Sequence, residues 1–114
     1  MVVRNRALLP EDEVDRIFRA LADATRRDIV RRTLAGEASV SELAGAYDMS
    51  FAAVQKHVAR LEGAGIVTKH PRGRERIVCA NHEVIAQVQA LLDRYEQIWR
   101  SRIDRLDAVL EDHE

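Results

Sequence analysis

Ser50 to Arg76 is the segment whose side chains can hydrogen-bond to a nucleic acid and neutralise its charge. Its first part predicts a helix with an apolar stripe spaced i, i+4 and i+7. That buried stripe consists of Val54, Val58 and Leu61. The opposite face then carries Gln55, which can pair bidentately with adenine, and Lys56, which can meet guanine or phosphate. The same face holds Phe51, Ala52 and Ala59, and small alanines permit close approach to thymine methyls.

Phosphate contacts are predicted at both ends of this helix and at the basic run that follows it. Ser50 caps the helix, whose first N–H groups form a ready phosphate site, and Arg60 lies near its far end. Pro71-Arg72-Gly73-Arg74 then joins two β-branched runs and predicts an exposed hairpin tip. Long guanidinium side chains there can reach phosphates or a minor groove. The candidate residues are Arg72, Arg74 and Arg76.

The charge distribution supports a nucleic-acid partner. The whole chain has a net charge of −1, but Ser50 to Arg76 holds six Lys or Arg against two Glu, leaving −5 on the remainder. A basic face on an acidic body suits DNA, because phosphate contact is local and electrostatic. No glycine-rich phosphate loop follows a strand, and no Ser or Cys nucleophile has a motif around it. The sequence therefore argues against an enzyme.

The flanking pattern predicts a mainly α fold with a small β-hairpin, a winged helix-turn-helix, as one domain over 1–114. Ser39 and Glu42 form a capping box that opens the helix-turn-helix, 39–63, and a wing hairpin follows at 66–80. Two helices precede it, one with Pro10 in its first turn and one opened by a Thr25–Asp28 capping pair. Residues 1–8 lack a pattern and are predicted to be a loose arm.

A long terminal helix is predicted over 82–112, capped by Asn81. Its apolar positions form one continuous stripe: Val88, Leu92, Tyr95, Trp99, Ile103, Leu106 and Leu110. About 30 residues span ~45 Å, whereas a domain of this size has a radius near ~13 Å. Part of the apolar stripe therefore needs a second surface to pack against, and a homodimer is the commonest way to supply one. The predicted dimer interface is Val14, Ile17, Phe18, Val88, Leu92, Tyr95, Trp99, Ile103 and Leu106; the alternative is that the last turns fray.

The remaining reactive side chains favour structural roles. His57 lies at the core edge of its helix and is expected to anchor it by a hydrogen bond. Cys79, the only cysteine, is expected to point inward with Ile77. Neither a His-x-x-x-His nor a Cys-x-x-Cys arrangement occurs, so no metal site within one chain and no cofactor are expected. A site shared between subunits, built from His82, Glu83, His113 and Glu114, stays open as an alternative.

Together these motifs resemble the ArsR/SmtB family of winged-helix repressors. The segments that carry the resemblance are 18–27 (FRALADATRR), 41–44 (SELA) and 49–67 (MSFAAVQKHVARLEGAGIV). The resemblance implies a homodimeric, operator-binding repressor with the helix after Ser50 as its reading helix. Metal-sensing members carry a Cys-rich motif before the turn, whereas 38–43 contains no thiol. The chain is thus similar to the branch without metal motifs, whose signals are varied.

The hypothesis is a cytoplasmic, sequence-specific regulator of transcription that binds double-stranded DNA as a homodimer on an inverted repeat. No apolar stretch approaches the ~20 residues that cross a bilayer, so no membrane partner is expected. Two alternatives remain: a winged-helix protein-interaction module without DNA binding, and a DNA-binding repressor with a metal or thiol effector. The sequence leaves the small-molecule effector, the operator and the regulated genes open.

Overall fold

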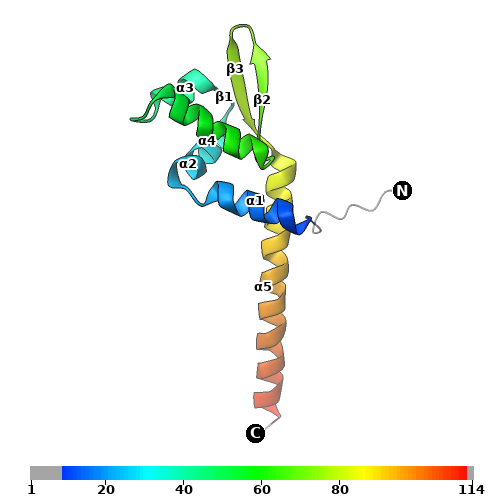
Figure 1. Ribbon diagram of the computed structural model, residues 1–114. Helices are drawn as coiled ribbons and strands as arrows, with labels where there is room; N and C mark the ends of the chain where they lie inside the picture. The colour runs from blue at the N-terminus through cyan, green and yellow to red at the C-terminus, as the bar shows by residue number, and fades with distance from the viewer. Residues whose placement is uncertain (1–8, 113–114) are drawn as a thin grey trace, which may run out of the picture. The chain divides into compact units, whose positions relative to one another are not determined.

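The computed structural model describes residues 9–112, which fall into two compact units, Pro10–Ile85 and the residues from Ala86 onward. The elements are helices and short strands (Figure 1). In chain order they are α1 (Glu11–Leu21), α2 (Ala24–Ala35), β1 (Ala38–Ser39), α3 (Val40–Gly45), α4 (Phe51–Gly63), β2 (Val67–Arg72), β3 (Glu75–Ala80) and α5 (His82–Glu111).

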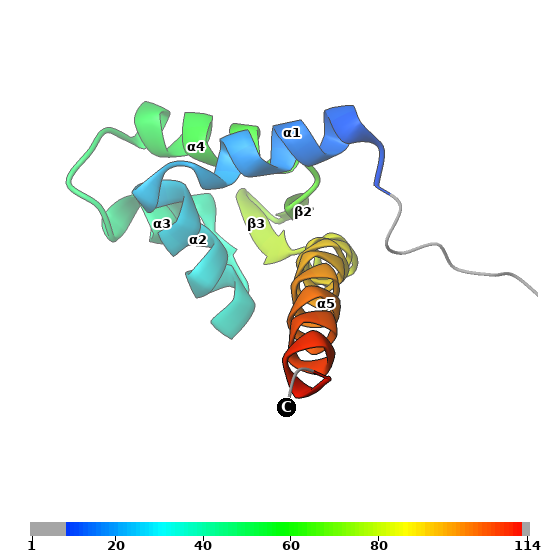
Figure 2. The ribbon, with the colours of Figure 1, turned by 90° about the horizontal axis from the view of Figure 1, so that it is seen from below.

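The core of the first unit lies between its helices and a three-stranded antiparallel sheet of order β1-β3-β2. Its largest fully buried side chains include Ile29, Leu43, Leu61, Val54 and Val78. Strand β1 was not predicted, because two residues are too short to show a period. Its register pairs Ser39 with Ile77, which ties the wing hairpin to the entrance of α3. Seen from below, α1 runs alongside α4 (Figure 2).

The helix-turn-helix has the caps that its sequence predicts. Ser39 Oγ accepts from the Glu42 N–H, and Glu42 Oε1 accepts from the Ser39 N–H. Ser50 Oγ accepts from the Ala53 N–H at 3.1 Å. At the far end, Gly65 has φ 78°, and the N–H groups of residues 65 and 66 bond back to the carbonyls of residues 62 and 61. That is a Schellman motif, and it aims the chain into β2.

Two predictions about helix starts were wrong. Pro10 is the N-cap of α1 rather than part of its first turn. Asp23, not Thr25, caps α2, and its Oδ1 accepts from the Arg26 N–H at 2.9 Å. An aspartate carboxylate is a stronger N-cap than a threonine hydroxyl, so the helix begins two residues earlier than the Thr25–Asp28 pattern suggested.

Asp28 instead holds the turn between α3 and α4 against α2. Its Oδ2 accepts from the Tyr47 hydroxyl at 2.5 Å and from Arg32 Nε at 2.8 Å, and its Oδ1 accepts from Arg31 Nη2 at 2.6 Å. The Arg32 guanidinium also lies over the Tyr47 ring, 5.5 Å from its centre. The hydrogen bond from Tyr47, followed by those from the two arginines, holds the pKa of Asp28 well below its usual range. Burial raises the pKa of Tyr47.

We expect Tyr47→Phe to raise the pKa of Asp28 toward its ordinary value and to lower Tm at pH 7. A depressed carboxyl pKa stabilises the fold above the unfolded-state pKa, about 4, and that stability is lost as pH falls through the lower folded value. The Tm difference between wild type and variant should therefore shrink below about pH 4. Thermal scans across pH, with an NMR titration of the Asp28 carboxyl, measure both. An unchanged Asp28 pKa in the variant would show that the tyrosine does not hold it.

The terminal helix α5 contains 30 residues, none of them buried. Its exposed large apolar side chains are Leu92, Tyr95, Ile98, Trp99, Ile103, Leu106, Val109 and Leu110. Within residues 9–112, no helix has a run of apolar residues long enough to cross a bilayer. The loose arm predicted for 1–8 lies outside the described residues.

Candidate nucleic-acid interface

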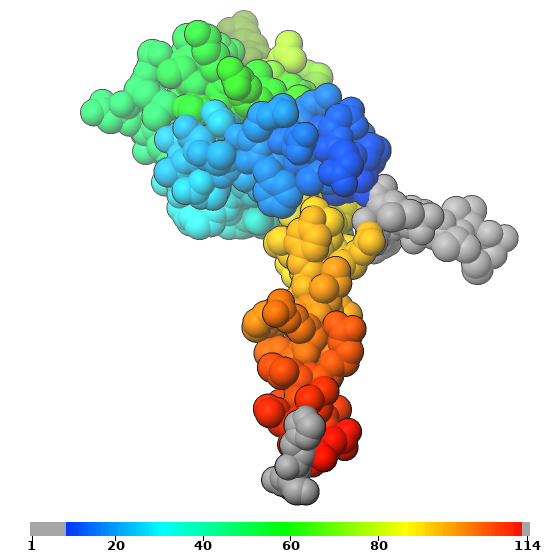
Figure 3. Space-filling model, turned by 60° about the horizontal axis from the view of Figure 1, so that its bottom comes forward, coloured from blue at the N-terminus to red at the C-terminus, as the bar shows by residue number. Residues whose placement is uncertain are grey.

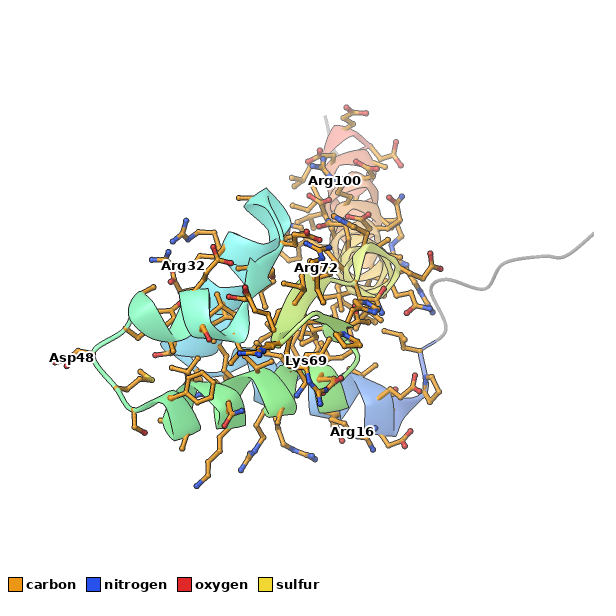
Figure 4. The ribbon with its side chains drawn as sticks, turned by 90° about the horizontal axis from the view of Figure 1, so that it is seen from above. Arg16, Arg32, Asp48, Lys69, Arg72 and Arg100 are labelled. Atoms are coloured by element: carbon orange, nitrogen blue, oxygen red, sulfur yellow. The ribbon has the colours of Figure 1, made fainter. Side chains whose placement is uncertain are left out.

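Helix α4 separates a buried stripe from an exposed face, as predicted. Val54, Val58 and Leu61 are at most 1% exposed. The residues predicted to meet DNA lie on the exposed side, from which long side chains project in Figure 4. We call this set the reading face: Phe51, Ala52, Gln55, Lys56, Ala59 and Arg60. Phe51 is a large apolar side chain that is 48% exposed, at the end of the helix that Ser50 caps.

A polar cluster fixes α4 against the start of α2. Arg26 Nη1 lies 3.3 Å from His57 Nδ1, and Asp23 Oδ1 lies 3.9 Å from the same nitrogen. Arg26 also donates from Nε to the Ala20 carbonyl at 2.6 Å and from Nη2 to the Arg19 carbonyl at 3.2 Å. The Arg26 guanidinium thus donates to backbone carbonyls near the end of α1 and also contacts His57 of the reading helix. The predicted anchoring role of His57 is confirmed, whereas the role of Arg26 was not predicted.

The hairpin tip is shorter than the sequence suggested. Pro71 and Arg72 belong to β2, and only Gly73 and Arg74 form the turn. Gly73 has φ 62° and Arg74 does not have a positive φ, the pattern of a type II′ turn with glycine first. Such a turn matches the twist of its strands and presents Arg74 at the tip.

Two of the six Lys and Arg side chains in Ser50 to Arg76 form ion pairs within the protein. Arg72 Nη1 lies 2.6 Å from Glu37 Oε1, and this hydrogen bond lowers the pKa of Glu37. Lys69 Nζ lies 3.5 Å from Glu62 Oε1. Within residues 9–112 no ion pair involves Lys56, Arg60, Arg74 or Arg76. The four cations of Ser50 to Arg76 that form no ion pair therefore lie on the reading face and at the end of the hairpin.

Cys79 lies on the same side of β3 as Ile77, as the alternation predicts, but it is half-buried and not part of the core. The residues of β3 that are buried are Ile77 and Val78, which are the two that pair with β1. The Cys79 thiol contacts Glu37 Oε2 at 3.8 Å. The described part of the chain contains no group of three or more His, Cys, Asp or Glu side chains placed to hold a metal ion. His113 and Glu114, which the shared metal site would use, lie outside it.

The predicted dimer residues divide between exposed and buried positions. Leu92, Tyr95, Trp99, Ile103 and Leu106 are exposed along α5, and Phe18 of α1 is 41% exposed. Val14 and Val88 are half-buried. Ile17 is only 2% exposed, so its place in a dimer interface was wrong: the apolar face of α1 is used by the core of its own unit.

Comparisons with known proteins agree with this geometry. A helix-turn-helix domain family matches residues 21–70. An HTH-type transcriptional regulator of Mycobacterium tuberculosis, Rv2034, is 38% identical over 81 residues, covering 71% of this chain and 76% of the relative. The crystal structure of an ArsR family transcriptional regulator is 36% identical, with TM-score 0.76, covering 82% of this chain and 96% of that one.

The chain belongs to the ArsR family of helix-turn-helix transcriptional regulators. This confirms the winged helix-turn-helix fold, and the ArsR family is one of regulators rather than enzymes. A further ArsR-type structure, from Mycobacterium bovis, is described as a homodimeric winged helix-turn-helix DNA-binding domain. It is 26% identical, with TM-score 0.62, and covers 75% of this chain and 83% of that one.

Proposed function

We propose that this ArsR-family protein is a homodimeric repressor that binds an inverted-repeat operator in the cytoplasm. The observation that carries the proposal concerns the described cations of Ser50 to Arg76. The four of them that form no ion pair, Lys56, Arg60, Arg74 and Arg76, lie on the reading face and at the end of the hairpin. A helix-turn-helix reading helix lies in the major groove, and two copies related by a two-fold axis meet grooves about 34–36 Å apart. The homodimeric DNA-binding relative from Mycobacterium bovis supports both parts.

The residues divide by the chemistry that each can supply. Gln55 and Lys56 read base edges, with Ala52 and Ala59 leaving room for the groove floor and Phe51 lying against the bases near the capped end. Ser50, Arg60, Arg74 and Arg76 hold phosphates. Arg72 is paired with Glu37 in the free protein. It can bind a phosphate only if this ion pair breaks and the phosphate takes the place of the Glu37 carboxylate. Both side chains of the pair are largely exposed, where an ion pair stabilises little.

The sharpest test of the function is to sequence genomic fragments retained by the purified protein and to titrate the enriched duplex across salt concentrations. We expect an inverted repeat, and an affinity that falls log-linearly with salt because phosphate contacts release counterions. A protein-interaction module without DNA binding would enrich no sequence and show no such salt dependence. Either result would contradict the proposal.

Arg74→Ala should weaken binding to operator and mixed duplex by the same factor. A phosphate contact carries no sequence information, so the salt slope should become shallower by about one unit on both. Fluorescence anisotropy at several salt concentrations measures this. The control is Arg105→Ala, which removes one cation from an exposed position of α5. A loss confined to the operator would instead show that Arg74 reads bases.

A further inference from the structure

A hollow between α1 and α4 is lined by three arginines. Arg16 and Arg19 come from α1 and Arg60 from the last turn of α4, with Ala20 between them. All three arginines are exposed, whereas Ala20 is 5% exposed. Figure 3 shows blue atoms of α1 bordering green atoms of α4. Three like charges around one hollow repel each other and favour an anion there.

The carboxylate near this cluster neutralises it weakly. Asp15 lies 3.9 Å from Arg19, and both side chains are more than 60% exposed, where such pairs contribute little. Within the described residues no ion pair involves Arg16 or Arg60. The Arg19 carbonyl is used by Arg26, but its guanidinium remains available. Guanidinium groups match phosphate geometry bidentately, so a phosphate is the anion best suited to this site.

The position of α1 beside the reading helix identifies the source of that phosphate. Packed helices lie about 8–10 Å apart, and the major groove is about 12 Å wide. A helix packed beside the reading helix therefore has no room in the same groove, and one that lies on the DNA-facing side of it meets the sugar-phosphate backbone that borders the groove. In Figure 4 the labelled Arg16 lies next to α4, on the side from which the side chains of α4 project.

We propose that Arg16, Arg19 and Arg60 together hold a backbone phosphate of the DNA duplex beside the groove that α4 reads. This deepens the proposed function and rests on it. The sequence hid this site because Arg16 and Arg19 follow the acidic run Glu11–Asp15, so the net charge of that stretch points away from DNA. The packing of α1 against α4 brings these two arginines next to Arg60 in the last turn of α4.

The test is duplex binding by an Arg16→Ala, Arg19→Ala double variant, with Arg105→Ala as control. We expect roughly tenfold weaker binding, equal on operator and mixed duplex, and a salt slope shallower by about one unit. Circular dichroism and Tm confirm that the fold is kept.

Asp15→Asn should have the opposite effect on affinity. It removes the carboxylate that pairs with Arg19, so binding to both duplexes should tighten by up to about fivefold.

The outcomes separate this proposal from the one on which it rests. If wild type and Arg74→Ala behave as predicted but the double variant matches wild type, the hollow does not contact DNA and the proposed function stands. If the loss appears on the operator alone, the arginines read bases and the phosphate site is wrong. If wild type binds no duplex, both proposals are overturned.

Discussion

Replacing Trp99 and Leu106 together by aspartate is expected to make the protein monomeric and to weaken operator binding by about 10²–10⁴-fold. The two side chains are 57% and 59% exposed on α5, and they lie seven residues apart on one face of the helix. Two new carboxylates would have to be desolvated in the proposed interface, where unpaired charge is costly. Without the dimer, each half-site is bound separately and the gain from a second tethered reading helix is lost. Sedimentation velocity and operator titration measure the two effects.

Ser101→Asp is the matched control for this variant. At 100° per residue, Ser101 lies roughly opposite Trp99 on the helix, and it is exposed. It adds one carboxylate two residues from Trp99, on the other side of the helix, and should leave both the dimer and its affinity intact. A Trp99→Asp, Leu106→Asp protein that stays dimeric would place the interface elsewhere, and a control that dissociates would show that any added charge disrupts the helix.

Gln55→Ala is expected to weaken operator binding by about 1–3 kcal/mol, roughly 5- to 150-fold, with little change on mixed duplex. Gln55 is exposed on α4 between the buried Val54 and Val58, so its amide can reach a base edge without disturbing the core. A bidentate amide–adenine pair discriminates between bases, whereas phosphate contacts do not. Competition titrations with operator duplexes that vary one base pair at a time would show relaxed preference at one position.

Gln97→Ala serves as the control for Gln55→Ala, because it removes the same side chain from an exposed position of α5. It should leave affinity and base preference unchanged. Equal losses by Gln55→Ala on operator and mixed duplex would refute the division of roles in which Gln55 reads bases and Arg74 holds phosphate.

Local signals were sufficient to predict most helices and the hairpin. The Ser39–Glu42 box and the Ser50 cap act through hydrogen bonds within a few residues, and both are present in the structure. Competition between neighbouring caps was harder to judge. Asp23 and Thr25 can each open a helix, and the structure uses Asp23, whose Oδ1 also lies within 3.9 Å of His57 on another helix.

The sequence by itself determined the reading face, because the i, i+4, i+7 stripe of α4 requires the opposite side to be exposed. Only the tertiary structure decided which cations lack an internal partner. Arg72 lies 35 residues from Glu37 in the chain, and Arg60 lies far in sequence from Arg16 and Arg19, which line the same hollow. Helical periodicity is set by neighbours on one element, whereas ion pairs and charge clusters between elements depend on how those elements pack.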